Sequence, residues 1–500
     1  MHSFGSLATK LSFGVGLASL IAAVGCGYGG SVHLPQTTGN YSAANVKGTY
    51  VYEVEGFSLV SGNPIREVGA FTADGMGNIT AGSDDTNLNS GGLPVSYVGS
   101  YSIGGDGTGS ITFNSTVFGP VTFFVTLVSS SKIYMMEGGS SLDGTGVAEL
   151  QDSTAAGATP SSTFVFRLHQ PISAPLNSAS ASDVGAVTIA SGAVSGQMDE
   201  NLGGTISTFN LTGGSFNAPG SLGRGTASFV DSGSFTTNLI YYIVNSGKFV
   251  LLVSNGGAVG AGSAEAQTGA VANGLSGNYV FGSSGETGNP DGIATVGQFL
   301  AVPATIGAGT ISGTEDVMQD GTYSSGVGIS SCIFGNSNGR VALTARSGTA
   351  CSGTTTQVFW MVSPSRAFFL NESANAVEDG TADLQTAASF AASTLKGQFA
   401  LVMNGIDLSV EALARIGPLQ FDGSNKLVLT ELVNASNSGV GAQSPGTLSG
   451  TYSVSSNGRV TGSLNNSSLN LVMYAISGSD AYVLQVDSGT STSGKVSLQH

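Results

Sequence analysis

The hexapeptide GVAELQ, residues 146–151, recurs along the chain as GSAEAQ at 262–267, GTADLQ at 380–385 and GKVSLQ at 494–499. Every copy carries a glycine five residues before its final glutamine, and successive glutamines stand 116, 118 and 114 residues apart. A nearly constant period of this length indicates tandem copies of one structural unit. We therefore predict four units of roughly 105 to 115 residues each.

Two further features recur inside the copies and predict strands joined by hairpins. The copies open with the related segments GTYVY (48–52), STFVF (162–166), GNYVF (277–281) and GQFAL (397–401). These segments alternate small or polar residues with aromatic or aliphatic ones, which is the period of a half-buried strand. Farther along come Asp106-Gly107, Asn338-Gly339 and Asn457-Gly458, dipeptides that favour tight hairpin turns. With the apolar runs near each end, one copy holds about eight strands.

These features predict an all-β protein of four tandem antiparallel β-meander units. Eight sequential strands can close into a barrel, which removes exposed sheet edges. A two-sheet sandwich is the alternative, because alternation alone does not determine hydrogen-bond register. We expect β-repeat 1 at 46–152, a divergent β-repeat 2 at 160–268, β-repeat 3 at 274–386 and β-repeat 4 at 394–500.

The N-terminal segment predicts export. Lys10 precedes the apolar stretch LSFGVGLASLIAAVGC, which suits the core of a signal peptide at residues 1–25. The stretch ends in Ala23-Val24-Gly25-Cys26, which resembles the lipobox of bacterial lipoproteins. In that family the cysteine becomes the lipidated first residue of the mature protein, so the resemblance implies lipidation of Cys26. An ordinary cleaved signal with an incidental cysteine is the alternative.

The resemblance to lipoproteins also implies a location in the cell envelope. Gly27 follows Cys26 in place of the aspartate that retains such proteins at the inner membrane, which implies an outer-membrane location, on the periplasmic face or the cell surface. Residues 26–45 would then be a lipidated, flexible tether. Cys332 and Cys351 would meet oxidising conditions, so we expect them to form a disulfide.

A second resemblance rests on FTADGMGNITAGSDDTN at residues 71–87, together with the lipoprotein signal and the later Asp-Gly or Asn-Gly turn. This arrangement looks like repeat-bearing lipoproteins of acidobacterial genomes, although the motif is complete only in the first copy. The resemblance implies an extracytoplasmic location and brings no activity. Within the stretch, we predict a hairpin turn at 74–77 with arms at 69–73 and 78–83.

Charge excludes one class of partner. Only 9% of residues are charged, the net charge is −16, and no run of basic residues exists. Nucleic-acid binding needs clustered Lys and Arg that displace counterions from phosphates, so we expect no such partner.

Catalytic and metal chemistry find little support in the sequence. Of the four histidines, His2 lies in the signal, His33 in the tether and His500 at the chain terminus, so His169 stands alone within a repeat, and we assign no catalytic residue. The neighbouring carboxylates Asp84 and Asp85, or Glu315 and Asp316, are candidates for glycoside hydrolysis. Calcium is the one metal considered, because hard cations prefer oxygen ligands. Its weak candidates share a position in three copies and are Asp85, Asp199 and Asp316.

We expect an exported, lipid-anchored repeat protein that acts as a binding or structural module, with a glycan or a protein as ligand. An enzyme acting on envelope or extracellular polysaccharide is one alternative, and a small-ligand carrier using barrel interiors is another. An enzyme needs a unique acidic cleft in one repeat, whereas a repeat binder should show an equivalent patch on several.

Overall fold

A computed structural model provides the structure of the chain. It describes residues 40–59, 61–87, 94–139, 142–171, 180–256, 258–269, 271, 274–287, 292–304, 308–335, 338–348, 350–408, 412–435, 445–465 and 468–500. The chain divides into Met1–His33 and a compact unit, Leu34–His500, which contains every strand. The expected signal peptide, Cys26 and most of the expected tether lie outside the described residues.

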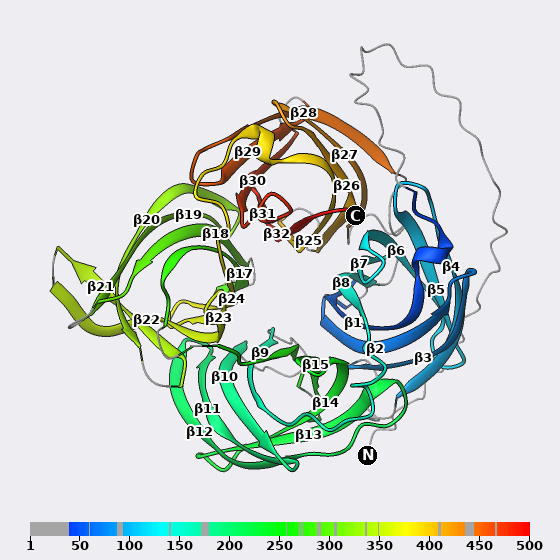
Figure 1. Cartoon of the computed structure of the whole chain (residues 1–500), viewed down its shortest axis with the longest axis horizontal. Coiled ribbons are helices and arrows are strands. Elements are labelled where there is room, and N and C mark those ends of the chain that lie inside the picture. Colours follow the sequence, from blue (N-terminus) through cyan, green and yellow to red (C-terminus); the bar gives the residue numbers. More distant parts are fainter. Residues whose placement is uncertain are drawn as a thin grey trace, which may run out of the picture. The chain divides into compact units, whose positions relative to one another are not determined.

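The predicted fold class is confirmed, since the described chain forms four closed antiparallel barrels of eight strands each (Figure 1). In every barrel, strands adjacent in sequence pair with each other, and the first strand also pairs with the last. Tyr50 on the first strand of barrel 1, for example, stands opposite Leu150 on its eighth. A barrel therefore leaves no sheet edge, and the sandwich alternative does not apply.

The strands of barrels 1 and 2 are as follows. Barrel 1 consists of β1 (Lys47–Ser58), β2 (Pro64–Asp74), β3 (Asn78–Thr86), β4 (Val95–Ile103), β5 (Thr108–Ser115), β6 (Gly119–Ser129), β7 (Lys132–Glu137) and β8 (Leu142–Leu150). Barrel 2 consists of β9 (Thr163–Gln170), β10 (Ala181–Ala190), β11 (Ala193–Leu202), β12 (Thr205–Phe216), β13 (Arg224–Asp231), β14 (Thr236–Asn245), β15 (Lys248–Val253) and β16 (Ala261–Ala266).

Barrels 3 and 4 repeat the same order. Barrel 3 consists of β17 (Gly277–Thr287), β18 (Ile293–Val302), β19 (Gly309–Gln319), β20 (Thr322–Gly335), β21 (Arg340–Ser347), β22 (Ala350–Ser363), β23 (Arg366–Asn371) and β24 (Ala376–Leu384). Barrel 4 consists of β25 (Lys396–Asp407), β26 (Leu413–Asp422), β27 (Lys426–Ala435), β28 (Gly446–Val454), β29 (Arg459–Leu464), β30 (Leu469–Ala475), β31 (Asp480–Gln485) and β32 (Thr490–Leu498).

The described helical structure is limited to single 3₁₀ turns. They are η1 (Ala43–Asn45), η3 (Ser221–Gly223) and η5 (Ala392–Thr394). Among the described residues, no helix has the length and apolar character needed to cross a bilayer.

The hairpin predicted within residues 71–87 is confirmed as the β2–β3 connection. Asp74 accepts hydrogen bonds from the backbone N–H groups of Met76 at 2.6 Å and Asn78 at 3.0 Å, and from the Asn78 amide at 2.7 Å. The carboxylate therefore caps its own turn. Both arms extend beyond the predicted ends, to Pro64 and Thr86.

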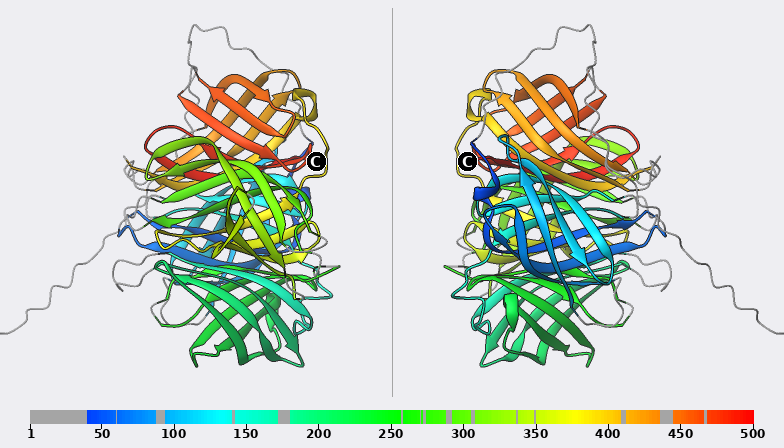
Figure 2. Two further views of the ribbon diagram at one scale, coloured as in Figure 1. Left: turned by 90° about the vertical axis from the view of Figure 1, so that its left-hand side faces the viewer. Right: turned by 90° about the vertical axis from the view of Figure 1, so that its right-hand side faces the viewer.

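Each barrel has its own core, built from the inward faces of its strands. In β1 the aromatic residues Tyr50 and Tyr52 point inward with Val54, while Val51 points outward. The strands cross one another obliquely in side view, which is the tilt that barrel closure requires (Figure 2).

The outward faces of several strands are buried as well, because the barrels pack against one another. In β15, Phe249 and Leu251 belong to the core of barrel 2, whereas Val250 and Leu252 pack on Val51 and its neighbours in barrel 1. Burial on both faces explains why this segment, KFVLLV, is a continuous apolar run without alternation.

The interfaces form a closed cycle. Separate apolar clusters join barrels 1 and 2, barrels 2 and 3, barrels 3 and 4, and barrels 4 and 1. The last of these contains Ala400 and Val402 of β25 with Tyr134 and Met136 of β7. Because the fourth barrel packs against the first, each barrel contacts a neighbour on two sides.

The recurrent glutamine connects one barrel to the next. In barrel 1, Gln151 donates from Nε2 to the carbonyl oxygens of Leu222 at 3.0 Å and Ile243 at 2.6 Å, both in barrel 2. Gln267 and Gln385 make the equivalent bonds to barrels 3 and 4. Gln499 closes the cycle, because its Nε2 donates to the backbone carbonyl oxygens of Asp106 at 3.3 Å and Leu127 at 2.6 Å in barrel 1.

The turn that receives this glutamine requires glycine for two reasons. Gly107 has a φ of +83°, where residues with a side chain are strained. A Cβ at Gly107 would also lie 2.7 Å from the Gln499 amide nitrogen. The final glutamine and this turn therefore meet at all four interfaces. The turn is Asp-Gly or Asn-Gly in barrels 1, 3 and 4, and Leu222-Gly223 in barrel 2.

Candidate functional site

A cavity of about 230 Å³, lined by both charged and apolar residues, lies where all four barrels meet. Most of its lining residues come from the first and last strands of each barrel, the pair that closes the barrel, and Val296 of β18 and Tyr482 of β31 complete the lining. The charged residues that line it are Glu53 and Glu55 of β1, Arg167 and His169 of β9, Asp379 of β24 and Lys495 of β32. No single repeat provides this set.

Strand alternation directs these side chains away from the barrel cores. Because Tyr50, Tyr52 and Val54 face the core of barrel 1, Glu53 and Glu55 must face outward. At the position of Glu53, counted from the start of each opening segment (residues 48, 162, 277 and 397), the other barrels have Arg167, Gly282 and Val402. At the position of Glu55 they have His169, Ser284 and Asn404. The cavity is therefore asymmetric in chemistry although the fold repeats.

Asp379 is the most highly bonded group of the cavity. It accepts hydrogen bonds from Arg167 at 2.8 Å, from His169 Nδ1 at 2.9 Å and from the Ser182 hydroxyl at 2.6 Å. Burial alone would raise the pKa of Asp379, but the charge of Arg167 and the bond from His169 outweigh burial and lower it to about 2. The same contacts with Asp379 outweigh burial at His169 and raise its pKa.

Ser182, His169 and Asp379 do not form a nucleophilic triad. In a triad, the acid binds one imidazole nitrogen and the serine binds the other. Here Ser182 and Asp379 both contact Nδ1 of His169, at 2.9 Å each, and Ser182 is fully buried. The cluster instead connects barrels 2 and 3 and fixes the guanidinium of Arg167 at the cavity wall.

Two other groups of the cavity titrate near neutral pH. Burial raises the pKa of Glu53 to about 6, although Lys248 and Arg167 act against the shift. Burial, assisted by the positive charges of Arg366 and Lys132, lowers the pKa of Lys495 to about 7. The side chain of Glu55 is 51% exposed, and the charges of Arg66 and His169 outweigh burial to lower its pKa.

Ion pairs beside the cavity cross between barrels. Glu149 of barrel 1 pairs with Lys248 of barrel 2. Arg366 of barrel 3 contacts Glu265 of barrel 2 at 2.8 Å and Asp383 of its own barrel at 2.7 Å. These pairs hold the closing strands in place and keep their charges satisfied.

The three aspartates considered for calcium lie elsewhere, one at each of three interfaces. Asp85 accepts two hydrogen bonds of 2.7 Å from Arg224 of barrel 2. Asp199 is paired in the same way with Arg340 of barrel 3, and Asp316 with Arg459 of barrel 4. The arginine follows the turn glycine in each case.

A buried aromatic donor completes each of these aspartate–arginine pairs. The donors are Tyr242 to Asp85 at 2.8 Å, Trp360 to Asp199 at 2.8 Å and Tyr474 to Asp316 at 2.7 Å. Calcium stays a weak candidate at these oxygens, because a bidentate arginine competes for the same lone pairs. Among the described residues, no group of three or more His, Cys, Asp or Glu side chains is arranged as metal ligands.

The fourth interface lacks all three members of this arrangement together. Leu432 stands at the position of the aspartate, Thr108 at that of the arginine and Thr126 at that of the aromatic residue. Leu432 packs against the apolar cluster between barrels 4 and 1 instead. Loss of the charges on both sides at once avoids a buried unpaired ion.

The carboxylate pairs proposed from adjacency are separated by the strand pleat. Asp85 faces Arg224 in the interface, while Asp84 faces the interior of barrel 1 and bonds with Glu67. Burial and the charges of Glu67 and Asp85 raise the pKa of Asp84 to about 9. Two directly bonded carboxyls leave no room for a glycosidic bond between them.

The interior of barrel 3 has a comparable acid, Glu315. Burial first, then the charges of Glu378 and Asp316, raise its pKa to about 7. Asp316 itself faces the interface between barrels 3 and 4, so Glu315 and Asp316 do not converge either.

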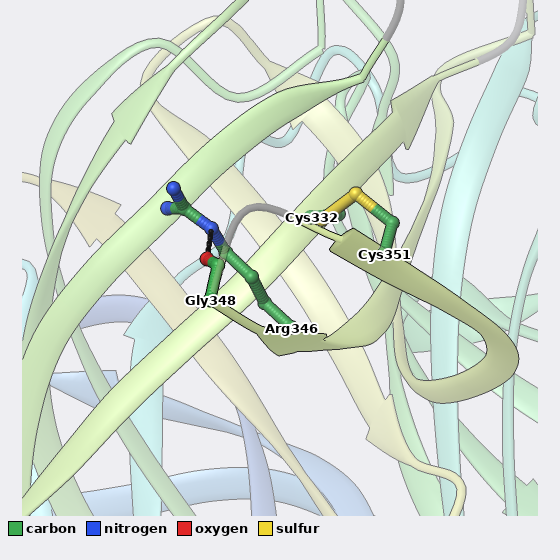
Figure 3. Close-up of a disulfide and its surroundings, with 4 residues drawn as sticks. All are labelled: Cys332, Arg346, Gly348 and Cys351. Atoms are coloured by element: carbon green, nitrogen blue, oxygen red, sulfur yellow. Dashed lines mark hydrogen bonds between the residues drawn. A yellow bond between two sulfur atoms is a disulfide. The ribbon is translucent and has the colours of Figure 1, made fainter.

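Cys332 and Cys351 form a disulfide between β20 and β22 (Figure 3). Next to it, Arg346 donates from Nε to the carbonyl oxygen of Gly348 at 2.9 Å and supports the β21–β22 turn. The disulfide therefore links β20 covalently to β22 within barrel 3.

Sequence reasoning missed the cavity residues because they come from four different repeats. Glu53, Arg167, Asp379 and Lys495 lie in separate copies, and no motif connects them. One signal was present, however. Each opening strand contains outward positions where the copies disagree, next to inward positions that stay apolar or aromatic.

Comparisons with known proteins do not place the chain in a family. No protein-family model matches it, and no curated protein does. Among solved structures it is similar to transferrin-binding protein B of Haemophilus parasuis, with 10% identity, coverage of 74% of this chain and 84% of that one, and a TM-score of 0.19. Transferrin-binding protein B of Neisseria meningitidis gives 9% identity, coverage of 73% and 83%, and 0.19.

Proposed function

We propose that the protein is an exported, lipid-anchored binding module of the cell envelope, and that its ligand binds at the central cavity. One observation carries the proposal. The final glutamines that join the barrels recur in all four copies, whereas the cavity-lining residues at the outward positions of the opening strands differ in every copy. Four structurally equal units thus surround a single site of mixed composition.

The chemistry of the cavity supports a polar ligand. Glu53 and Glu55 present negative charge, Lys495 presents an amine without an ion pair among the described contacts, and Arg167 and His169 are fixed by Asp379. A volume of about 230 Å³ admits one sugar ring or one charged side chain. We infer a glycan or a polar segment of a protein as the ligand class.

Two features support the extracytoplasmic location. The Cys332–Cys351 disulfide is of a kind that persists outside the reducing cytoplasm. The segment ending at Cys26 resembles a lipoprotein signal, and the lipid would attach the barrels to the outer membrane.

The test uses the intact lipoprotein on a glycan array and on an array of envelope and host proteins. We expect a signal that is lost in Glu53→Gln and in Lys495→Met. The matched control is Lys426→Met, which removes an exposed lysine outside the cavity. Equal binding by the cavity variants would contradict the proposed site, and release of reducing sugar ends would favour an enzyme.

The location is tested separately by treating intact cells with protease. Degradation of the barrels supports a surface module. Full protection combined with no array signal would count against a surface module.

A further inference from the structure

The interior of barrel 3 contains a second cavity, of about 260 Å³, that is chemically unlike the central one. Its floor is a cluster of four phenylalanines, Phe281, Phe299, Phe359 and Phe369. Ring centroids within this cluster lie 5.0 to 5.9 Å apart, so the rings present a continuous aromatic surface.

A single sequence position accounts for the space. Six residues after the turn glycine, barrel 1 has Phe113, barrel 2 has Phe229 and barrel 4 has Leu464, all buried in the barrel cores. Barrel 3 has Ala345 at this position, and Ala345 lines the cavity. In barrel 1, the ring of Phe113 contacts those of Tyr97 and Phe71 at 4.2 and 5.4 Å and fills the core.

A second position adds to the space in barrel 3, because a smaller side chain replaces a tyrosine there. Tyr97 stands opposite Gly82 in barrel 1, and Ile329 stands opposite the matching Gly313 in barrel 3. Ala345 and Gly328 both line the cavity and are exposed, so the cavity communicates with solvent along β20.

Polar groups lie at one side of the aromatic floor. Glu315, Gln357 and Asn371 line the cavity, and Asn371 is held in place by donating to Glu378 at 3.0 Å. The site therefore combines stacking surface with a hydrogen-bond acceptor, the composition of a small-molecule pocket. Dry apolar cavities of ~150 Å³ bind benzene, so this volume admits a larger ring system.

We propose that the interior of barrel 3 binds one small aromatic molecule that carries a hydroxyl group, with the ring on the phenylalanine floor and the hydroxyl donating to Glu315. This site is independent of the central cavity and does not rest on the function proposed for it. It makes barrel 3 a ligand-holding barrel, while the matching side chains fill the other three.

The experiment is titration calorimetry of the full chain with 2-naphthol and, in parallel, with naphthalene. We expect one equivalent of 2-naphthol to bind. Ala345→Phe, which introduces the residue of barrels 1 and 2, should abolish binding. Ala345→Leu, which introduces the residue of barrel 4, serves the same purpose if the phenylalanine is not accommodated. Ala81→Phe, on an exposed position of barrel 1, is the matched control and should bind normally.

The hydroxyl contact has its own variant. Glu315→Gln should weaken 2-naphthol binding by about tenfold and leave naphthalene binding unchanged, because only the hydroxyl contacts the carboxylate. No binding by the unaltered chain, or equal binding by a folded Ala345→Phe variant, would overturn the proposal. An equal effect of Glu315→Gln on both compounds would overturn the assignment of the hydroxyl.

Discussion

At the scale of single residues, the pleat of a strand decides what each acid can do. Asp84 and Asp85 are neighbours in sequence, yet one lies in the core of barrel 1 and the other in the interface with barrel 2. The interfacial aspartate is compensated by Arg224 and Tyr242. The interior aspartate is bonded to another acid, Glu67, and burial with the charges of Glu67 and Asp85 raises its pKa, so it remains protonated.

Stability should therefore depend on pH through Asp84. The folded chain keeps this proton up to about pH 9, whereas an unfolded aspartate loses it near pH 4. Between these values the folded state binds more protons, so the free energy of unfolding falls as pH rises. Asp84→Asn should raise that free energy at pH 8 by about 2 kcal/mol and have little effect at pH 4. Urea titrations at both pH values measure this, and an equal change at both would refute the assignment.

At the scale of elements, the disulfide between Cys332 and Cys351 supports the long strands β20 and β22 of barrel 3. The strands β20 and β22 each have 14 residues, and β20 is largely exposed. The disulfide between them closes a loop with a sequence separation of 19. Such a loop restricts the unfolded chain more than the folded one.

Removing this bridge should destabilise barrel 3 locally. The double variant Cys332→Ser with Cys351→Ser should lose about 3 kcal/mol, as expected for a loop of this length. Hydrogen exchange of peptides from β20 to β22 should accelerate, while the same strands of barrel 1, β4 to β6, serve as the internal control. Unchanged hydrogen exchange in barrel 3 would show that the disulfide does not stabilise these strands.

The glutamine that ends each repeat predicts an interface-specific effect. Gln499→Ala removes the donor to Asp106 and Leu127, which should cost about 2 kcal/mol. This loss should appear as faster amide hydrogen exchange in the peptides at the interface of barrels 4 and 1. Gln267→Ala is the matched variant and should loosen only barrels 2 and 3. Changes spread equally over all interfaces would contradict this picture.

At the scale of the whole molecule, the closed cycle of interfaces ties four cores together. Every barrel shares apolar clusters with two neighbours. A barrel that unfolds therefore exposes apolar surface on both sides and removes support from its neighbours.

We expect the barrels to unfold together. Calorimetry should show one main transition for Leu34–His500, rather than four. Asp199→Ala should lower the transition temperature, because it leaves Arg340 and Trp360 without their acceptor at a cost of about 3–5 kcal/mol. Four resolved transitions in the unaltered chain would indicate independent barrels.

Much of the fold could be predicted from the sequence, because it depends on local chemistry. The repeat of Gln151, the alternation in 48–52 and the turn at Asp74-Gly75 each specify short-range structure that neighbouring residues enforce. The same residues could not reveal the central cavity. Its members are distant in sequence and meet only because the fourth barrel packs against the first.

The number of units, their sequential strands and the hairpin turns follow from local sequence, since backbone conformation and face alternation are set within a few residues, whereas barrel closure does not. The packing of the barrels decided which outward faces became interfaces and which remained open. That decision made Asp85 an ion-pair partner of Arg224, brought Glu53 and Lys495 to one cavity, and left barrel 3 hollow beside Ala345. Burial and charge pairing act between groups close in space, whatever their distance along the chain, so local sequence could not specify these contacts.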